Sequence, residues 1–354
     1  MTNLSWPKVL SSLLAGEDLT RDAASWSMTQ VMSGEATPAQ IGAFMLALRS
    51  KGETVQELAG LVDVMLRNAV LLDTGSDAVD IVGTGGDLVG TVNISSMAAI
   101  LAAAAGIPVL KHGSRSASGK TGSSEMLEVL GIRLDLSPQQ VSEVFRRTGI
   151  TFFFAPVFHP AMRHVAPIRK ELAIPTTFNF LGPLANPAQP IATALGVADL
   201  KIAPLMAMEM ATRGRSGLVF RSHDGLDELS TSAPATIWQV SNGEVRVIEL
   251  DASDLGLARS DQAMLLGGDA QHNANVASKL FEGSGFENSN AIRDVVLLNA
   301  AAGIVSYELA QDSNLADQSL ESRFSSALDL ASDTLDKGLA AKKLSDWSQS
   351  TQSV

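Results

Sequence analysis

A five-residue segment that directly follows a short β-branched run has the composition of a phosphate-binding turn. Gly83-Thr84-Gly85-Gly86-Asp87 follows Val79–Val82 and precedes an alanine-rich segment that begins at Ser95-Ser96. Glycines allow a backbone to approach an anion closely, and the free N–H groups at a helix N-terminus face that anion. A strand, a glycine turn and a serine-capped helix in this order predict that the ligand carries phosphate.

An isolated glycine cluster can also be a turn with a structural role only. The residues beside this turn help to choose between that interpretation and a ligand site. The dinucleotide-binding fingerprint needs a glycine where Leu88 stands, so that pattern does not fit. Small polar side chains able to hydrogen-bond ribose or phosphate oxygens follow instead, namely Thr91, Asn93, Ser95 and Ser96. They favour the ligand site.

A second segment, Lys111–Ser123, combines three cations with glycines and hydroxyl groups. Gly119-Lys120-Thr121 matches the end of a P-loop, but five residues instead of four separate Gly113 from Gly119, which breaks the Walker spacing. The segment connects an expected strand to an expected helix, where parallel sheets collect ligands. A flexible loop that closes over an anion is therefore favoured over a solvated basic loop.

The acidic segment Asp224-Gly225-Leu226-Asp227-Glu228 has two interpretations. Adjacent carboxylates repel each other, which is tolerable on a solvated turn or beside a cation. In a chain with two anion loops, an oxygen-ligated Mg²⁺ that bridges phosphates is plausible. Composition alone leaves the choice open. His159 and His164 lack the spacing of a zinc motif, and a structural role is the default for each histidine.

These loops need a scaffold, and the hydrophobic pattern indicates one. Up to Arg67 the apolar residues recur at helical intervals, and Thr37-Pro38 has the form of a helix start. Beyond that point, expected strands at 78–82, 107–110, 151–154 and 217–220 alternate with helices, including 124–130 and a capped helix from Ser137 to Thr148. Such alternation predicts a largely parallel sheet covered by helices.

Seven of the thirteen prolines lie between residues 156 and 190, which predicts a segment broken into short pieces. We interpret it as the crossing between two domains, with a long surface excursion as the alternative. The expected domains are a helical one at 1–70, joined by part of 165–190, and an α/β one at 71–164 and 191–345. Residues 346–354 are expected to form a polar, frayed tail.

The net charge of −12 argues against general nucleic-acid binding, because no broad basic field exists to attract a polyanion. Cysteine is absent, which excludes disulfides and thiolate metal sites. The N-terminus lacks the features of a signal peptide, and the longest apolar stretch, Met97–Ala105, is too short to cross a bilayer. We expect a cytoplasmic protein without a membrane anchor.

Taken together, the motifs resemble the anthranilate phosphoribosyltransferase family of tryptophan biosynthesis, from about residue 5 to about residue 345. Six segments in the right order carry the resemblance: Gly83–Asp87, Thr91–Ser96, Lys111-His112-Gly113, His159-Pro160-Ala161-Met162, Gly182–Pro187 and Asp227-Glu228. The resemblance implies an α/β fold of the nucleoside phosphorylase and phosphoribosyltransferase type. A small N-terminal helical domain and a larger domain with a mostly parallel central sheet are joined by hinge segments. It also implies a homodimer through the helical domain.

The resemblance further implies how the substrates bind. Phosphoribosyl pyrophosphate would be held by Gly83, Gly86, Asp87, Thr91, Asn93, Ser95, Ser96, Lys111, His112, Gly113, Ser114, Arg115, Ser118, Gly119 and Ser123. Mg²⁺, with two ions expected, would be bound by Ser95, Asp227 and Glu228. Anthranilate would contact Gly83 and the residue at 114, and its carboxylate would face Arg169, since a planar guanidinium suits a carboxylate. The family normally has asparagine where this chain has Ser114, which puts acceptor binding in doubt.

The implied reaction is attack of the anthranilate amine on the ribose anomeric carbon as pyrophosphate leaves, which requires no enzyme nucleophile. One alternative is a pyrimidine nucleoside phosphorylase, which shares the architecture. Asp227-Glu228 and Gly182-Pro183 favour the transferase. A second alternative is a non-catalytic relative that binds nucleic acid. The net charge of −12 and the intact donor motifs speak against it.

Overall fold

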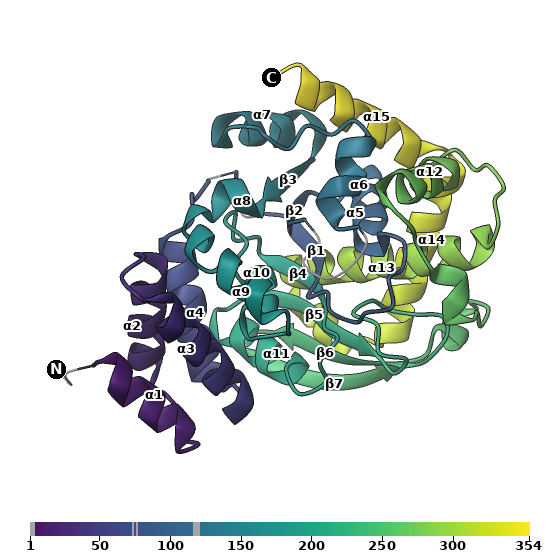
Figure 1. The fold of residues 1–354 in the computed structure, drawn as a ribbon. Coiled ribbons are helices and arrows are strands. Elements are labelled where there is room, and N and C mark those ends of the chain that lie inside the picture. Colours follow the sequence, from purple (N-terminus) through teal and green to yellow (C-terminus); the bar gives the residue numbers. More distant parts are fainter. Residues whose placement is uncertain (1–3, 73, 76, 116–120) are drawn as a thin grey trace.

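The computed structural model describes residues 4–72, 74–75, 77–115 and 121–354. One seven-stranded sheet in the order β3-β2-β1-β4-β5-β6-β7 forms its centre (Figure 1). The strands are β1 Val79–Gly83, β2 Val109–Gly113, β3 Ile150–Phe154, β4 Ala192–Gly196, β5 Ser216–Ser222, β6 Ala235–Ser241 and β7 Glu244–Leu250. The first five pair in parallel and the last two pair antiparallel. The predicted mostly parallel sheet is confirmed.

Alternate residues of the strands face two separate hydrophobic cores, as the period of a strand requires. Ile81 of β1 and Leu218 of β5 belong to the larger core, together with helices α5 (Ile94–Ala104) and α13 (Ser289–Gln311). Their neighbours Val82 and Val219 belong to the second core, together with α11 (Ala203–Thr212). A sheet buried on both faces needs the long apolar runs that the sequence shows.

Helices surround the sheet and complete both cores. The helices of the α/β part are α5 Ile94–Ala104, α6 Ser123–Val129, α7 Pro138–Thr148, α11 Ala203–Thr212, α12 Ala270–Phe281, α13 Ser289–Gln311, α14 Leu320–Asp336 and α15 Leu339–Gln352. Short 3₁₀ helices lie at η2 Ala252–Leu255, η3 Gln262–Leu265 and η4 Ser313–Asp317. α5 is buried at nearly every position because α13 and α15 pack around it. This explains its unbroken run of apolar and alanine residues.

The first four helices gather beside the larger part of the molecule (Figure 1). They are α1 Trp6–Leu14, α2 Arg21–Met32, α3 Pro38–Lys51 and α4 Val55–Arg67. Thr37 and Thr54 cap α3 and α4 with complete capping boxes, and Pro38 occupies the first position of α3 as predicted. The predicted helical unit and its partner α/β unit are both present.

The proline-rich segment consists of short helices, as predicted. They are α8 Ala155–Phe158, η1 Pro160–His164, α9 Ala166–Leu172 and α10 Phe178–Leu184. Phe178 and Leu181 are buried in the same core as Phe44 of α3 and Val82 of β1. The segment therefore runs through the contact between the helical unit and the sheet and is not a surface excursion.

The expectation of a frayed tail at 346–354 is wrong. Helix α15 continues to Gln352, and the Trp347 side chain is only 1% exposed. The Thr351 hydroxyl accepts a hydrogen bond from the Arg133 N–H at 3.1 Å, which ties the chain end to a loop 218 residues earlier. The polar residues cover the solvent face, so the segment has few apolar residues although it is packed. Within the described ranges, no helix is long and apolar enough to span a bilayer.

Candidate active site

A cavity of about 800 Å³ lies at the carboxyl ends of β1 and β2 and brings most of the predicted site residues together. Loops after parallel strands meet at this edge, which is where α/β sheets bind ligands. The predicted residues that line it are Gly83, Gly86, Asp87, Thr91, Asn93, Ser95, Lys111, His112, Gly113, Ser114, Arg115, Ser123, Arg169, Asp227 and Glu228. Ser118 and Gly119 lie outside the described residues.

Ser96 is the one described residue of the predicted set that does not line the cavity. Its side chain is 0% exposed, and its hydroxyl has no hydrogen-bond partner in the described structure. Successive residues of a helix point about 100° apart, so Ser95 faces the cavity while Ser96 faces the interior. The sequence pattern could not separate two adjacent serines at a helix start.

The glycine turn is fixed by an acidic residue far away in the sequence. Oδ2 of Asp227 accepts a hydrogen bond from the Gly85 N–H at 2.6 Å, across 142 residues. A Cβ atom on Gly83 would lie 2.3 Å from the same oxygen, so only glycine fits there. Gly85 itself has φ +68°, which an L side chain rarely adopts. The turn therefore holds Asp227 directly beside the predicted phosphate site.

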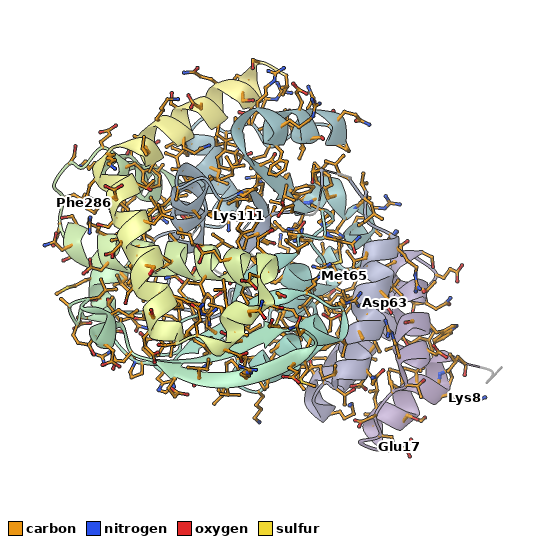
Figure 2. All side chains as sticks on the ribbon, turned by 180° about the vertical axis from the view of Figure 1, so that it is seen from behind. Lys8, Glu17, Asp63, Met65, Lys111 and Phe286 are labelled. Atoms are coloured by element: carbon orange, nitrogen blue, oxygen red, sulfur yellow. The ribbon has the colours of Figure 1, made fainter. Side chains whose placement is uncertain are left out.

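Lys111 on β2 is 2% exposed and lies inside the larger domain (Figure 2). Its Nζ donates to the Ile81 carbonyl at 2.5 Å and to the Ser95 hydroxyl at 3.4 Å. Burial lowers the pKa of Lys111, and the nearby charges of Asp80 and Glu228 oppose that shift. The ammonium thus joins the two predicted loops and offsets buried carboxylates.

Three carboxylates on the cavity have raised pKa values. Burial, followed by the charge of Asp87, raises the pKa of Asp227 to about 7. Burial, followed by the charge of Asp227, raises the pKa of Glu228 well above its ordinary value. Burial also raises the pKa of Asp87. Crowded carboxylates repel each other when they ionise, and a hard cation bound between their oxygens relieves that repulsion. These residues therefore fit Mg²⁺ as oxygen ligands.

The protein supplies only part of such a coordination sphere. In the described part of the chain, no three His, Cys, Asp or Glu side chains come close enough to hold a metal by themselves. One Glu228 oxygen also accepts a hydrogen bond from the Ser95 N–H at 3.2 Å. Mg²⁺ commonly takes one or two carboxylates and completes its shell with substrate phosphate oxygens and water. The donor set therefore suits an ion that arrives with a phosphate ligand.

Two neutral histidines lie on the wall of the cavity, with ring centroids 5.2 Å apart. Nδ1 of His112 bonds the Gly182 carbonyl at 3.1 Å, and Nε2 of His159 bonds the Ala185 carbonyl at 2.9 Å. Burial, followed by the neighbouring His159, lowers the pKa of His112 to about 3. Burial lowers the pKa of His159 to about 4. His112 links β2 to α10 through the Gly182 carbonyl, and His159 links the end of α8 to Ala185, which follows α10.

Arg169 on α9 also lines the cavity. Among the described residues, its guanidinium has no carboxylate or hydrogen-bond partner, and burial lowers its pKa. A desolvated, unpaired guanidinium is suited to an incoming carboxylate, which it can bind through two parallel hydrogen bonds. Ser114 is exposed at the end of β2 on the same cavity. Arg115 instead pairs with Glu128 at 3.0 Å and stacks on Phe154.

Four residues between positions 266 and 273 also line the site, although no motif in the sequence analysis pointed to them. Leu266, Gly267, Gly268 and Asn273 border the cavity. Leu266 forms an isolated antiparallel bridge with Thr91, and the Thr121 hydroxyl donates to the Gly268 carbonyl at 2.9 Å. A signal was present in the sequence, because Gly267-Gly268 precedes Asp269, which caps α12. This is the same order of glycines and helix cap that marked the first turn.

Comparison with known proteins gives matches along nearly the whole chain. Residues 7–69 match the family described as "Glycosyl transferase family, helical bundle domain", and residues 75–341 match "Glycosyl transferase family, a/b domain". An anthranilate phosphoribosyltransferase from Leifsonia xyli is 52% identical over 98% of this chain and 99% of its own length. The chain belongs to the anthranilate phosphoribosyltransferase family. A member from an Arthrobacter species is 50% identical over 97% of this chain and 95% of its own.

Solved structures of anthranilate phosphoribosyltransferases have the same fold. The Thermus thermophilus enzyme superposes with a TM-score of 0.87 at 35% identity, over 97% of this chain and 99% of that one. The Saccharomyces cerevisiae enzyme, solved in complex with PRPP and Mg, gives 0.84 at 26% identity, over 99% and 98%. The predicted fold, transferase class and phosphoribosyl-transfer activity are confirmed at the level of the family. Anthranilate phosphoribosyltransferases that are about half identical along nearly the whole chain favour the transferase over the phosphorylase and the nucleic-acid-binding alternatives.

Proposed function

We propose that this chain transfers the phosphoribosyl group of 5-phosphoribosyl 1-pyrophosphate to the amine of anthranilate, giving N-(5-phosphoribosyl)anthranilate and pyrophosphate. The observation that carries the proposal is one cavity lined by two chemically different groups. The glycine turn and the carboxylates of Asp227 and Glu228 form one group, and the unpaired guanidinium of Arg169 is the other. A phosphorylated donor matches the first group, and a carboxylate-bearing acceptor matches the second.

In this proposal the donor lies against the glycine turn, the start of α5 and the end of β2. Its contacts are Gly83, Gly86, Asp87, Thr91, Asn93, Ser95, Lys111, His112, Gly113, Ser114, Arg115 and Ser123, all of which line the cavity. The roles of Ser118 and Gly119 stay predictions. The acceptor contacts Gly83 and Ser114 and places its carboxylate on Arg169.

We propose Ser95, Asp227 and Glu228 as the residues that hold Mg²⁺ together with the diphosphate, with two ions as the expected number. The raised pKa values of the two carboxylates support this assignment, because a divalent cation relieves the repulsion that causes them. When bound, Mg²⁺ neutralises the charge that builds up on the departing diphosphate.

The remaining chemistry is positioning. The bond between the amine nitrogen and the anomeric carbon forms as the carbon–oxygen bond to pyrophosphate breaks, and pyrophosphate takes the electron pair. The amine gives up one proton, which passes to solvent water. Arg169 and Ser114 orient the acceptor, while the glycine turn and the β2 loop fix the donor, so both reactants are held before bond formation. Lys111 and the N-terminus of α5 add positive potential beside the leaving group.

One fluorescence assay tests the proposal. Anthranilate fluorescence should disappear with time only when phosphoribosyl pyrophosphate and Mg²⁺ are both present, and omission of either should leave it constant. A constant signal in the full mixture, together with a thermal shift on addition of the donor, would show that the acceptor assignment is wrong. Constant fluorescence without any donor-induced shift would reject the whole proposal.

We also propose that two copies of this chain associate through the helical domain. Leu14 at the end of α1 and Leu46 on α3 are large apolar side chains exposed on that unit. Sedimentation should give twice the mass of 37.1 kDa, and Leu46→Glu should shift it toward the monomer. A monomer in the unaltered protein would contradict this. A cytoplasmic location stays a prediction.

A further inference from the structure

Three loops of the cavity meet at one buried amide, that of Asn273 on α12. Its side chain is 1% exposed. Oδ1 accepts a hydrogen bond from the Gly268 N–H at 2.8 Å, and Nδ2 donates to Oδ1 of Asn93 at 2.9 Å, across 180 residues. Asn93 in turn directs its Nδ2 at the Thr121 carbonyl, 3.5 Å away. The three loops after β1, after β2 and before α12 are thereby joined.

The polarity of this chain of amides is fixed at both ends by backbone groups. A backbone N–H can only donate, so the atom of Asn273 that faces Gly268 must be its oxygen. The nitrogen of Asn273 then faces Asn93, which requires the oxygen of Asn93 on that side. The Thr121 carbonyl can only accept, and it lies on the nitrogen side of Asn93. All three hydrogen bonds therefore fit one arrangement, in which the Asn273 oxygen faces Gly268 and the Asn93 nitrogen faces Thr121.

We propose that Asn273 is a positioning residue for the donor, because it forces Asn93 to present its N–H₂ group, and not its carbonyl, to the anionic ligand. The contact of Asn93 with Thr121 is at the long limit of a hydrogen bond and uses only one of the two N–H donors of the Asn93 amide. The second N–H of Asn93 remains available to phosphate or ribose oxygens in the cavity. An amide turned the other way would direct a partial negative charge at those oxygens. This inference rests on the proposed function.

The close packing around Asn273 leaves little room for another arrangement. A Cβ atom on Gly267 would lie 2.7 Å from the Thr91 carbonyl oxygen and 2.8 Å from Oδ1 of Asn273. The Gly267 N–H donates to the Gly90 carbonyl at 2.9 Å, which holds this loop against the one after β1. The glycine pair thus brings the α12 loop close enough for the amide of Asn273 to reach Asn93.

The test is Asn273→Asp, in which a carboxylate keeps the acceptor for Gly268 but cannot donate to Asn93. The Asn93 amide should then reverse and present its carbonyl to the donor. We expect the KM for phosphoribosyl pyrophosphate to rise at least tenfold, with less than a twofold change in the KM for anthranilate. Asn275→Asp is the matched control, because it makes the same charge change on the exposed face of α12, and it should change neither constant.

A double-mutant cycle separates reversal of Asn93 from the added charge. In an Asn93→Ala background the charge remains but there is no amide to reverse, so Asn273→Asp should raise the donor KM by less than threefold. An equal factor in both backgrounds, or a parallel rise in both KM values, would overturn the proposal. If Asn273→Asp does not fold, Asn93→Asp presents only acceptors without altering α12 and should raise the donor KM equally. Absence of donor-dependent turnover in the unaltered protein would reject the proposed function instead.

Discussion

Gly83 and Asp227 lie so close together that no side chain fits between them. A Cβ atom on Gly83 would approach Oδ2 of Asp227 to 2.3 Å, and that oxygen already bonds the Gly85 N–H at 2.6 Å. The glycine turn and the acidic segment therefore form one unit at the carboxyl ends of β1 and β4. A change in either part displaces the other.

Gly83→Ala should abolish most of the activity while the protein stays folded. The added methyl group must push the Asp227 carboxylate away from Gly85, which disturbs the proposed metal and phosphoribosyl pyrophosphate contacts together. We expect at least a hundredfold loss in kcat/KM for the donor, equal to about 2.7 kcal/mol of transition-state stabilisation. Gly285→Ala, at an exposed glycine with open space around it, is the control. Unchanged kinetics for Gly83→Ala would show that the contact has no functional role.

Asp227→Asn should raise the Mg²⁺ concentration needed for half-maximal rate by about tenfold or more, because a neutral amide is a weaker ligand for a hard cation. A Mg²⁺ titration at saturating substrates measures it. Asp254→Asn removes the same charge from an exposed position and should leave the titration unchanged. If both variants follow the curve of the unaltered protein, Asp227 is not at the metal site.

Arg169→Gln should raise the KM for anthranilate about tenfold or more and leave the KM for the donor nearly constant. Loss of a charge-assisted, bidentate contact with a carboxylate costs about 1.5–3 kcal/mol. The guanidinium has no partner of its own in the described structure, so its loss should not destabilise the fold. Lys170→Gln on the same helix, at an exposed position, is the control. An equal rise in both KM values would place Arg169 outside the acceptor site.

Ser114→Asn should lower the KM for anthranilate. The longer amide, exposed at the end of β2 on the same cavity as Arg169, adds a hydrogen bond that the serine hydroxyl does not reach directly. Steady-state kinetics at saturating donor should show a severalfold decrease, and Ser284→Asn in an exposed loop should show none. A higher KM would mean that the site is adapted to the smaller residue.

The unfolding free energy should depend on pH through His159. Burial lowers its pKa to about 4 in the folded state, against an ordinary value of 6.5. Between these values the unfolded chain binds more protons, so His159 reduces stability progressively as the pH falls from 6.5 toward 4. His159→Gln keeps a donor for the Ala185 carbonyl and should reduce the stability lost between pH 7.5 and 4.5 by about 2 kcal/mol.

Urea unfolding at both pH values measures this difference. His272→Gln makes the same substitution at an exposed histidine and is the matched control. If His159→Gln loses as much stability as the unaltered protein between the two pH values, the folded state accommodates a charged ring at this position.

Local sequence patterns predict several of the helix starts and strands. The predictions fail for residues whose conformation or role depends on partners far away in the sequence. The helix starts at Thr37 and Ser137 involve contacts within one helical turn, so the sequence pattern predicts both of them. Residues 346–352 continue a packed helix because the Trp347 side chain is buried against the rest of the domain, and a polar composition conceals that contact. Ser96 was assigned to the site because helix rotation relative to the cavity is not a local property.

Residues that are adjacent in the chain predict the kind of ligand. A strand, a glycine turn and a helix start place neighbouring backbone N–H groups where they can face a phosphate. The fold then sets which distant residues complete the predicted site. It placed Asp227 against Gly85 across 142 residues and Asn273 against Asn93 across 180. Parallel strands bring remote loops to one edge of the sheet, and the order of those strands is set by packing of the whole core and not by any local segment.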